Sequence, residues 1–152
     1  MKAPLAEVPR PALKLGFAGL IPFAAGAVAV RIDDGRLTAV VHAVLLGYAC
    51  AIASFMAGVQ WGFGSVAELD DRDRFRVLGL SVVPALIAWL ALLAPLLIGY
   101  AGMILAFVLI YRTDLGLAQR SLTPAWYPTL RLPLTLGVVL CLASGLIEAM
   151  GQ

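Results

Sequence analysis

Long hydrophobic runs separated by short polar segments set the pattern of this chain. Four runs stand out, at residues 15–30, 39–66, 77–111 and 132–150. A helix needs about 20 apolar residues to cross the hydrocarbon core of a membrane, so runs of this length predict membrane-spanning helices. The composition agrees, because 62% of the 152 residues are hydrophobic and only 13% are charged, whereas a soluble domain carries more polar surface.

The third run is too long for one span. It holds 35 residues without a charge, and a single helix over 77–111 would be ~52 Å long at ~1.5 Å per residue. Pro95 lies near its middle, and proline suits the first turn of a new helix better than the interior of an old one. We therefore expect a single domain over residues 1–152 with five spans, at about 15–30, 39–66, 77–94, 95–111 and 132–150.

The distribution of positive charge supports five spans and predicts their orientation. Five spans place nine Lys and Arg residues on one side and two on the other, whereas four spans give six and five. Cytoplasmic loops carry the excess of Lys and Arg. We therefore expect an all-α integral membrane bundle with a cytoplasmic N-terminus and a periplasmic C-terminus, in the inner membrane of a bacterium. The nine are Lys2, Arg10, Lys14, Arg72, Arg74, Arg76, Arg112, Arg120 and Arg131, and the two are Arg31 and Arg36.

Small residues recur at helical spacing in the second and the last span. Helices in lipid gain little from hydrophobicity when they pack, so close approach of their backbones matters more. Both stripes predict tight helix contacts, either inside the bundle or with another subunit. The predicted packing residues are Gly47, Ser54, Gly58, Gly62, Gly137 and Gly145.

Five polar and aromatic residues are expected near the cytoplasmic ends of these same two spans: Gln60, Trp61, Trp126, Tyr127 and Arg131. One interpretation is an aromatic belt at headgroup depth with a positive flank. The other is a shared pocket for a lipid headgroup, a quinone ring or a partner segment, in which Gln60 and Arg131 supply the polar contacts.

At the opposite face, His42 and Glu148 form a possible polar pair near the outer ends of their spans. Two such ligands do not make a zinc site, which usually has at least three protein ligands. Cys50 and Cys141 lie inside apolar runs without CxxC spacing, and we expect them to be buried as small hydrophobic residues. No metal or other cofactor is therefore expected.

Three segments resemble the transmembrane-protein-69-like family of bacteria and mitochondria. They read "LGFAGLIPF" (15–23), "GYACAIASFMAGVQWG" (47–62) and "LTPAWYPTLRLPLT" (122–135). The resemblance implies a small multi-span inner-membrane protein and supplies no established activity. In the family pattern the position of Gln60 is often histidine, and glutamine keeps hydrogen bonding while losing histidine-based cofactor chemistry.

No nucleophile–base pair, phosphate-binding loop or basic–aromatic nucleic-acid motif is visible in the sequence. We therefore expect a non-enzymatic membrane subunit or assembly factor that packs against a larger inner-membrane complex, a respiratory complex being one candidate. Its expected partners are membrane lipids and another membrane protein or a second copy of itself, with no nucleic acid. The alternatives are a lipid- or quinone-binding membrane module and a small transporter, although the middles of the spans are too apolar for a polar path.

Overall fold

The computed structural model describes residues 7–32 and 37–151. Every element of regular secondary structure in this part of the chain is a helix, as predicted. Five stretches are long and apolar enough to cross a membrane, and α1 and α2 together make the first of them. The predicted break at Pro95 is observed, because α4 ends at Leu93 and Pro95 is the N-cap of α5. The helices are α1 (Arg10–Ala18), α2 (Ile21–Ile32), α3 (Thr38–Val66), α4 (Asp71–Leu93), α5 (Leu96–Gln119) and α6 (Tyr127–Met150).

The first span begins earlier than expected and is divided by a tight turn. The backbone N–H of Gly19 bonds to Leu15 and that of Leu20 bonds to Phe17, and α2 starts directly afterwards. Pro22 is the second residue of α2, and because proline has no N–H, it cannot continue the hydrogen-bond ladder of α1. The turn allows α1 and α2 to contact different neighbours.

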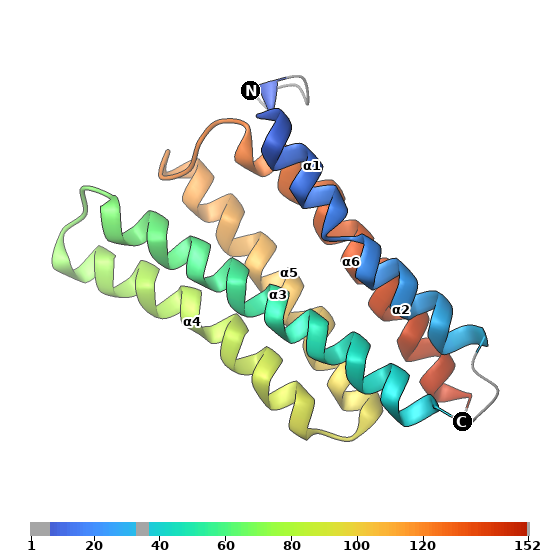
Figure 1. Ribbon diagram of the computed structural model, residues 1–152. Helices are drawn as coiled ribbons and strands as arrows, with labels where there is room; N and C mark the ends of the chain where they lie inside the picture. The colour runs from blue at the N-terminus through green and yellow to red at the C-terminus, as the bar shows by residue number, and fades with distance from the viewer. Residues whose placement is uncertain (1–6, 33–36, 152) are drawn as a thin grey trace.

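Two helices form the centre of the bundle. α3 packs against α2, α4 and α5, while α5 packs against α3, α4 and α6 (Figure 1). α2 contacts both α3 and α6, whereas the main contacts of α1 are with α6. The start of α1 and the end of α6 lie at opposite ends of the bundle, which agrees with an odd number of spans.

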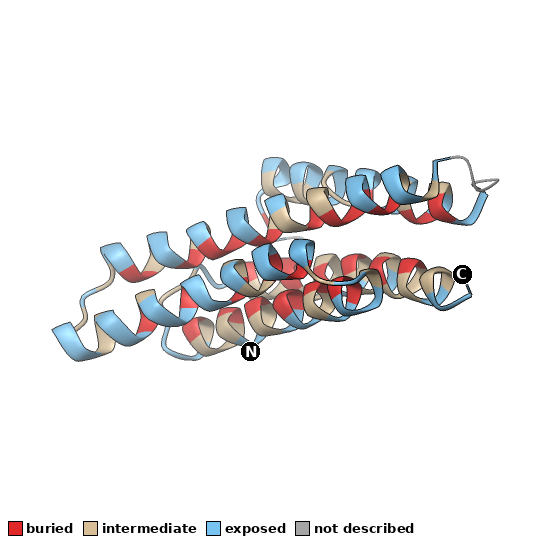
Figure 2. Cartoon of the chain, turned by 90° about the horizontal axis from the view of Figure 1, so that it is seen from below, coloured by how far each residue is buried: buried red, intermediate tan, exposed pale blue. Residues whose placement is uncertain are grey.

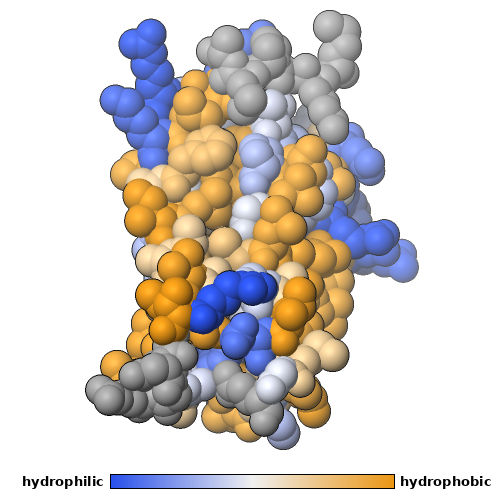
Figure 3. All heavy atoms as spheres, turned by 90° about the vertical axis from the view of Figure 1, so that its right-hand side faces the viewer, coloured by the Kyte–Doolittle hydropathy of each residue, from blue (hydrophilic) through white to orange (hydrophobic). Residues whose placement is uncertain are grey.

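Buried residues lie on the inward face of each long helix, and exposed residues lie on the outside (Figure 2). The outside is itself largely apolar: the face in Figure 3 is mostly hydrophobic, with a few hydrophilic patches. The outside of a membrane-spanning bundle contacts lipid hydrocarbon, so its outer side chains are apolar as well as those of its core. The largest fully buried apolar side chains are Phe23, Leu45, Tyr100, Met103, Phe107, Ile110 and Leu142.

The small residues that α3 turns inward are three alanines and Gly64, so the predicted stripe of this helix does not make its contacts inside the bundle. Ala49, Ala53 and Ala57 are buried, but a Cβ added at Gly58 would meet nothing within 4 Å. The same holds at Gly47 and Gly62, and Ser54 is exposed. The buried stripe is thus offset by one residue, or ~100° around the helix. Burial of Gln60 explains this orientation of α3, because the rotation about the helix axis that buries its amide also turns Ala53 and Ala57 inward.

The last helix does use its glycines for close contacts. A Cβ added at Gly137 would lie 2.9 Å from a methyl group of Leu20, and one at Gly145 would lie 2.6 Å from ring atoms of Tyr100. The first contact places α6 against the α1–α2 turn. The second places it against the start of α5.

Charged residues fix the connection between α3 and α4. The side chain of Asp70 caps α4 by accepting a 2.7 Å hydrogen bond from the N–H of Asp73. Arg74 donates to backbone carbonyls at the end of α3 and in the connection, among them that of Ser65. An ion pair between Asp73 and Arg120 links the first turn of α4 to the end of α5.

Candidate functional site

A buried polar cluster joins three helices near one end of the bundle. We call it the Asp114 cluster, and its members are Gln60 of α3, Asp114 of α5, and Tyr127 and Arg131 of α6. Arg131 donates its Nε–H to Asp114 Oδ2 over 2.7 Å, and Gln60 donates its amide N–H to Oδ1 over 2.8 Å. The Tyr127 hydroxyl donates to the same Oδ1 over a longer 3.4 Å.

Helical spacing accounts for the position of each member. Asp114 falls on the inward stripe of α5 with Phe107, Ile110 and Leu117, which are all buried. Gln60, Asp114 and Arg131 lie four to six residues inside the ends of their helices, or roughly 6–9 Å at ~1.5 Å per residue. The cluster therefore lies at one level, inside the expected hydrocarbon edge but close to it.

The two charges stabilise each other at this depth. Asp114 is fully buried and Arg131 is 6% exposed, and removing either charge from water costs several kcal/mol without a partner. Gln60 adds a second bond, from its amide N–H to the carbonyl of Ile110. The cluster is thus neutral overall, and it links α3, α5 and α6.

Arg131 has more donors than the cluster uses. Its Nη1 reaches only the sulfur of Met56, at 3.4 Å, and in the described part of the chain its Nη2 has no hydrogen-bond partner. One turn further along α6, the Oγ1 of Thr135 is also buried without a partner among the described residues. Buried polar groups are normally satisfied, so each exception calls for an explanation.

Both residues line one cavity of about 120 Å³. Its remaining walls are apolar and come from the α1–α2 turn, α3, α5 and α6. Leu15 and Phe55 are wall residues that are 74% and 65% exposed, so the cavity opens to the side of the bundle. We call it the α1–α6 cavity. Its lining residues are Leu15, Gly16, Gly19, Leu20, Phe23, Ile52, Phe55, Met56, Phe107, Arg131, Leu134, Thr135 and Val138.

The structure brings together only part of the predicted cytoplasmic group. Gln60, Tyr127 and Arg131 meet around Asp114. Trp126 is half-buried and contacts the Tyr127 ring edge-on, with centroids 6.0 Å apart. Trp61 is 46% exposed and lies outside the cluster, so a shared pocket that includes Trp61 is not what the structure shows. The reason is again the rotation of α3, since burying Gln60 turns its neighbour outward.

The sequence does not predict a role for Asp114, because the apolar run ends at Tyr111 and the charged residues after it resemble a loop. The helix continues to Gln119 instead. One signal was available: Asp114 continues the spacing of Met103, Phe107 and Ile110 at intervals of three or four residues. A carboxylate on a buried stripe requires a buried donor.

At the other end of the bundle, His42 forms a hydrogen bond with Tyr100. His42 Nδ1 and the Tyr100 hydroxyl are 2.7 Å apart, and both residues are buried. Gly145 leaves the space that the Tyr100 ring occupies. Glu148 is half-buried near the end of α6, and its carboxylate forms no ion pair with any described residue. The predicted pairing of His42 with Glu148 is therefore replaced by a histidine–tyrosine contact.

Among the residues that the structure describes, metal-binding side chains form no cluster. No three His, Cys, Asp or Glu side chains there lie close enough to hold an ion. Cys50 and Cys141 are half-buried free thiols on different helices.

Comparisons with known proteins give the family. Residues 8–147 match the family described as "Protein of unknown function (DUF3429)". The chain is 35% identical over 145 residues to Transmembrane protein 69 of Xenopus tropicalis, covering 95% of this chain and 57% of that protein. It is 28% identical over 134 residues to Transmembrane protein 69 of Mus musculus, covering 87% of this chain and 54% of that protein.

The chain thus spans little more than half the length of the curated relatives it matches. No solved structure matches it significantly. The family match extends over the parts of all three helices that build the Asp114 cluster, and the first relative aligns with almost the whole chain. The chain therefore belongs to the transmembrane-protein-69-like family, DUF3429.

Proposed function

We propose that this protein is a non-catalytic membrane module that binds one carbonyl-bearing amphiphile in the α1–α6 cavity. One observation carries the proposal: Arg131 Nη2 and Thr135 Oγ1 are buried without partners among the described residues, and both residues line the same cavity. An unsatisfied buried donor costs about 1–3 kcal/mol, so a ligand atom that accepts from these groups gains binding energy.

The charge of the site favours a carbonyl over an anion. Asp114 already balances the charge of Arg131 through the 2.7 Å ion pair, and a second anion would face the Asp114 carboxylate. A neutral acceptor satisfies the free N–H without this repulsion. Quinone rings and the ester groups of acyl lipids both offer such an acceptor, joined to an apolar tail.

The walls of the cavity suit the tail. Apart from Arg131 and Thr135, its lining is glycine and apolar side chains, and it opens between Leu15 and Phe55. An amphiphile in the bilayer can therefore enter sideways, with its tail along α1 and its carbonyl toward α6. A volume of about 120 Å³ holds the head of such a molecule or a short part of an acyl chain, and the remainder stays in lipid.

Thermal unfolding in nanodiscs tests this proposal and separates the two carbonyl sources. One arm adds a short-tailed benzoquinone, and the other compares diester with diether phospholipids, which lack the carbonyl. We expect the quinone or the ester to raise the melting temperature of the wild type. Thr135→Val, which removes only the hydroxyl, should reduce that rise.

Thr113→Val is the matched control, because the Thr113 hydroxyl bonds to Leu109 of its own helix and lies outside the α1–α6 cavity. It should keep the full wild-type response. Equal responses of Thr135→Val and the wild type would overturn the proposal, as would a wild type that responds to neither carbonyl source.

The second candidate is the accessory subunit predicted from the sequence, and the outer face of α3 favours it. Gly47, Gly58 and Gly62 each have open space where a Cβ would lie, and no described helix covers them. A partner helix can approach such a backbone closely. Gly58→Leu should then release a co-purifying protein without lowering the stability of the monomer, and retention of every partner would count against this role.

A further inference from the structure

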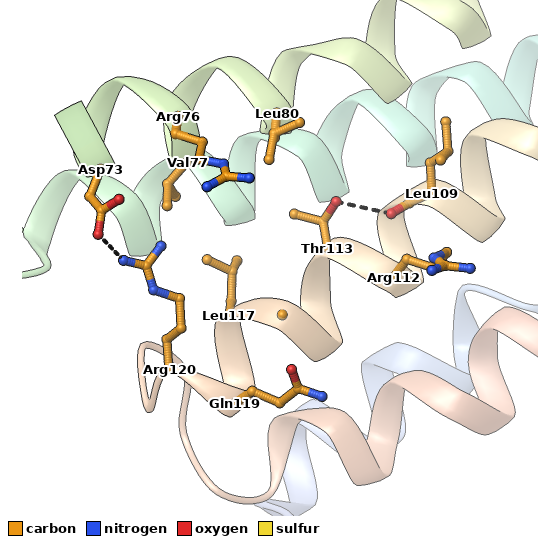
Figure 4. Close-up of a pocket in the computed structure, with 11 residues that line it drawn as sticks. Asp73, Arg76, Val77, Leu80, Leu109, Arg112, Thr113, Leu117, Gln119 and Arg120 are labelled. Atoms are coloured by element: carbon orange, nitrogen blue, oxygen red, sulfur yellow. Dashed lines mark hydrogen bonds and ion pairs between the residues drawn. The ribbon is translucent and has the colours of Figure 1, made fainter.

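A second site lies at the same end of the bundle, on the outer side of α4 and α5. It is a groove of about 640 Å³ between these helices, separate from the α1–α6 cavity (Figure 4). Its polar part contains three arginines, and its apolar part contains Val77, Leu80, Leu109 and Leu117. We call it the α4–α5 groove.

Helical spacing concentrates positive charge along the groove. Arg112 and Gly116 of α5 and Arg120 at its C-cap are four residues apart, so they share one face. Asp73 and Arg76 face them from the first turns of α4. Arg120 forms an ion pair with Asp73 and closes the end of the groove.

Arg76 and Arg112 are the unpaired charges of the groove. Figure 4 shows Arg76 extending from α4 into the space between the helices, and Arg112 coming from α5. Among the described residues, neither guanidinium has an ion pair. Both are exposed and lie five to seven residues inside their helix ends, or roughly 8–10 Å. Long arginine side chains at this depth reach the headgroup level.

Gly116 keeps the middle of the groove open. A Cβ added there would meet nothing within 4 Å, although the residue lines the groove between Arg112 and Arg120. The result is a hollow with two free guanidinium groups at headgroup depth and leucine and valine walls below. Guanidinium groups bind phosphate oxygens with matched hydrogen-bond geometry.

From this arrangement we infer that the α4–α5 groove binds the phosphate of an anionic phospholipid, with the lipid chains along the apolar wall. The net positive charge of the free arginines selects an anionic headgroup over a zwitterionic one, since the latter brings its own cation. Basic hollows between membrane helices take such headgroups by the same chemistry. Here the lipid would bridge α4 and α5 beside the Asp73–Arg120 ion pair.

The test measures melting temperature in nanodiscs of phosphatidylcholine, with and without phosphatidylglycerol. We expect phosphatidylglycerol to raise the melting temperature of the wild type by a few degrees, and the double variant Arg76→Gln/Arg112→Gln to lose most of this rise. Arg72→Gln is the matched control, because Arg72 is exposed on the same helix and does not line the groove. It should keep the rise.

Gly116→Leu gives a steric version of the same test. Open space at Gly116 means that the larger side chain fits the fold, and leucine favours helix more than glycine does. Its melting temperature in phosphatidylcholine alone should be equal to that of the wild type or higher, while the response to phosphatidylglycerol is lost. A full response in Gly116→Leu, or an equal loss in Arg72→Gln, would overturn the inference.

A last arm separates lipid from free phosphate. Inorganic phosphate added to phosphatidylcholine nanodiscs, at constant ionic strength, should give no shift, and a shift as large as that of phosphatidylglycerol would refute a lipid ligand. Thr135→Val should leave the response to phosphatidylglycerol unchanged, so this inference and the proposed carbonyl ligand succeed or fail separately.

Discussion

Asp114 is the acceptor around which the buried polar side chains of three helices are arranged. Its two carboxylate oxygens accept from Arg131, Gln60 and Tyr127. Of these four residues the sequence predicts three as a group, since each is polar or aromatic near a span end. It does not predict their partner, because a carboxylate three residues beyond an apolar run looks like part of a loop.

Removing the charge of Asp114 should be much more costly than removing the whole ion pair. Asp114→Asn leaves the Arg131 guanidinium buried without its counter-charge, a change that typically costs about 3–5 kcal/mol. The double variant Asp114→Leu/Arg131→Met replaces both charges with apolar groups and should cost less than Asp114→Leu alone or Arg131→Met alone. Reversible unfolding in mixed micelles measures all of these variants, and additive losses would contradict a coupled pair.

Two glycines that the sequence treats alike should respond in opposite ways. Gly145→Ala places a methyl group 2.6 Å from the Tyr100 ring, so the ring must move and its 2.7 Å contact with His42 is disturbed. We expect a loss of about 1–3 kcal/mol, as for other overpacked sites.

Gly58→Ala is the matched control for that substitution. It meets open space and should stabilise the monomer by up to about 1 kcal/mol through helix propensity. The same unfolding experiment in micelles compares the two variants. Loss of similar size in both would mean that Gly58 is packed after all.

At the scale of helices, hydropathy and proline predict most of what is observed. Pro95 divides the longest apolar run, as predicted, and α5 begins directly after it. The division of the first span into α1 and α2 was not predicted, since hydropathy runs unbroken through Gly19 and Leu20. Nor does spacing alone predict which small-residue stripe of α3 faces inward, because the choice depends on burying Gln60.

The divided first span predicts unequal protection from hydrogen exchange. α1 has no buried residue, whereas α2 buries Phe23, Ala27 and Val30. Amides of α1 should therefore exchange faster than those of α2 in the same nanodisc sample. Ligand in the α1–α6 cavity should slow exchange in α1 first, because Leu15 and Gly16 line it. Equal exchange rates in both helices would contradict the expectation that α1 is less protected than α2.

For the whole molecule, the bundle fixes which connections share an end but not which compartment that end faces. The α3–α4 and α5–α6 connections lie together, as the Asp73–Arg120 ion pair shows, and the end of α6 lies opposite. The nine-to-two distribution of Lys and Arg predicts that the connections face the cytoplasm.

Cysteine labelling in a variant without Cys50 and Cys141 tests this orientation. Cysteines at Glu68 and Ala125 should react only with reagent that reaches the cytoplasm, and cysteines at Pro95 and Gly151 only with reagent outside. All four positions are exposed in the described structure. Labelling of Ala125 and Gly151 from one compartment would contradict five spans, and a full exchange of sides would contradict the orientation alone.

The amphiphile in the α1–α6 cavity is the central claim, and native mass spectrometry of the purified protein tests it most directly. We compare the wild type with Thr135→Leu and with Thr113→Val as the control. Thr135→Leu removes the hydroxyl that would contact the amphiphile, and its larger side chain fills part of the cavity. Beside any anionic phospholipid held in the α4–α5 groove, the wild type and the control should each retain one further molecule whose mass is that of a quinone or an acyl lipid, and Thr135→Leu should lose only this further molecule. A wild type that sprays without any adduct, or a Thr135→Leu variant that keeps the same adduct at the same occupancy, would contradict the claim.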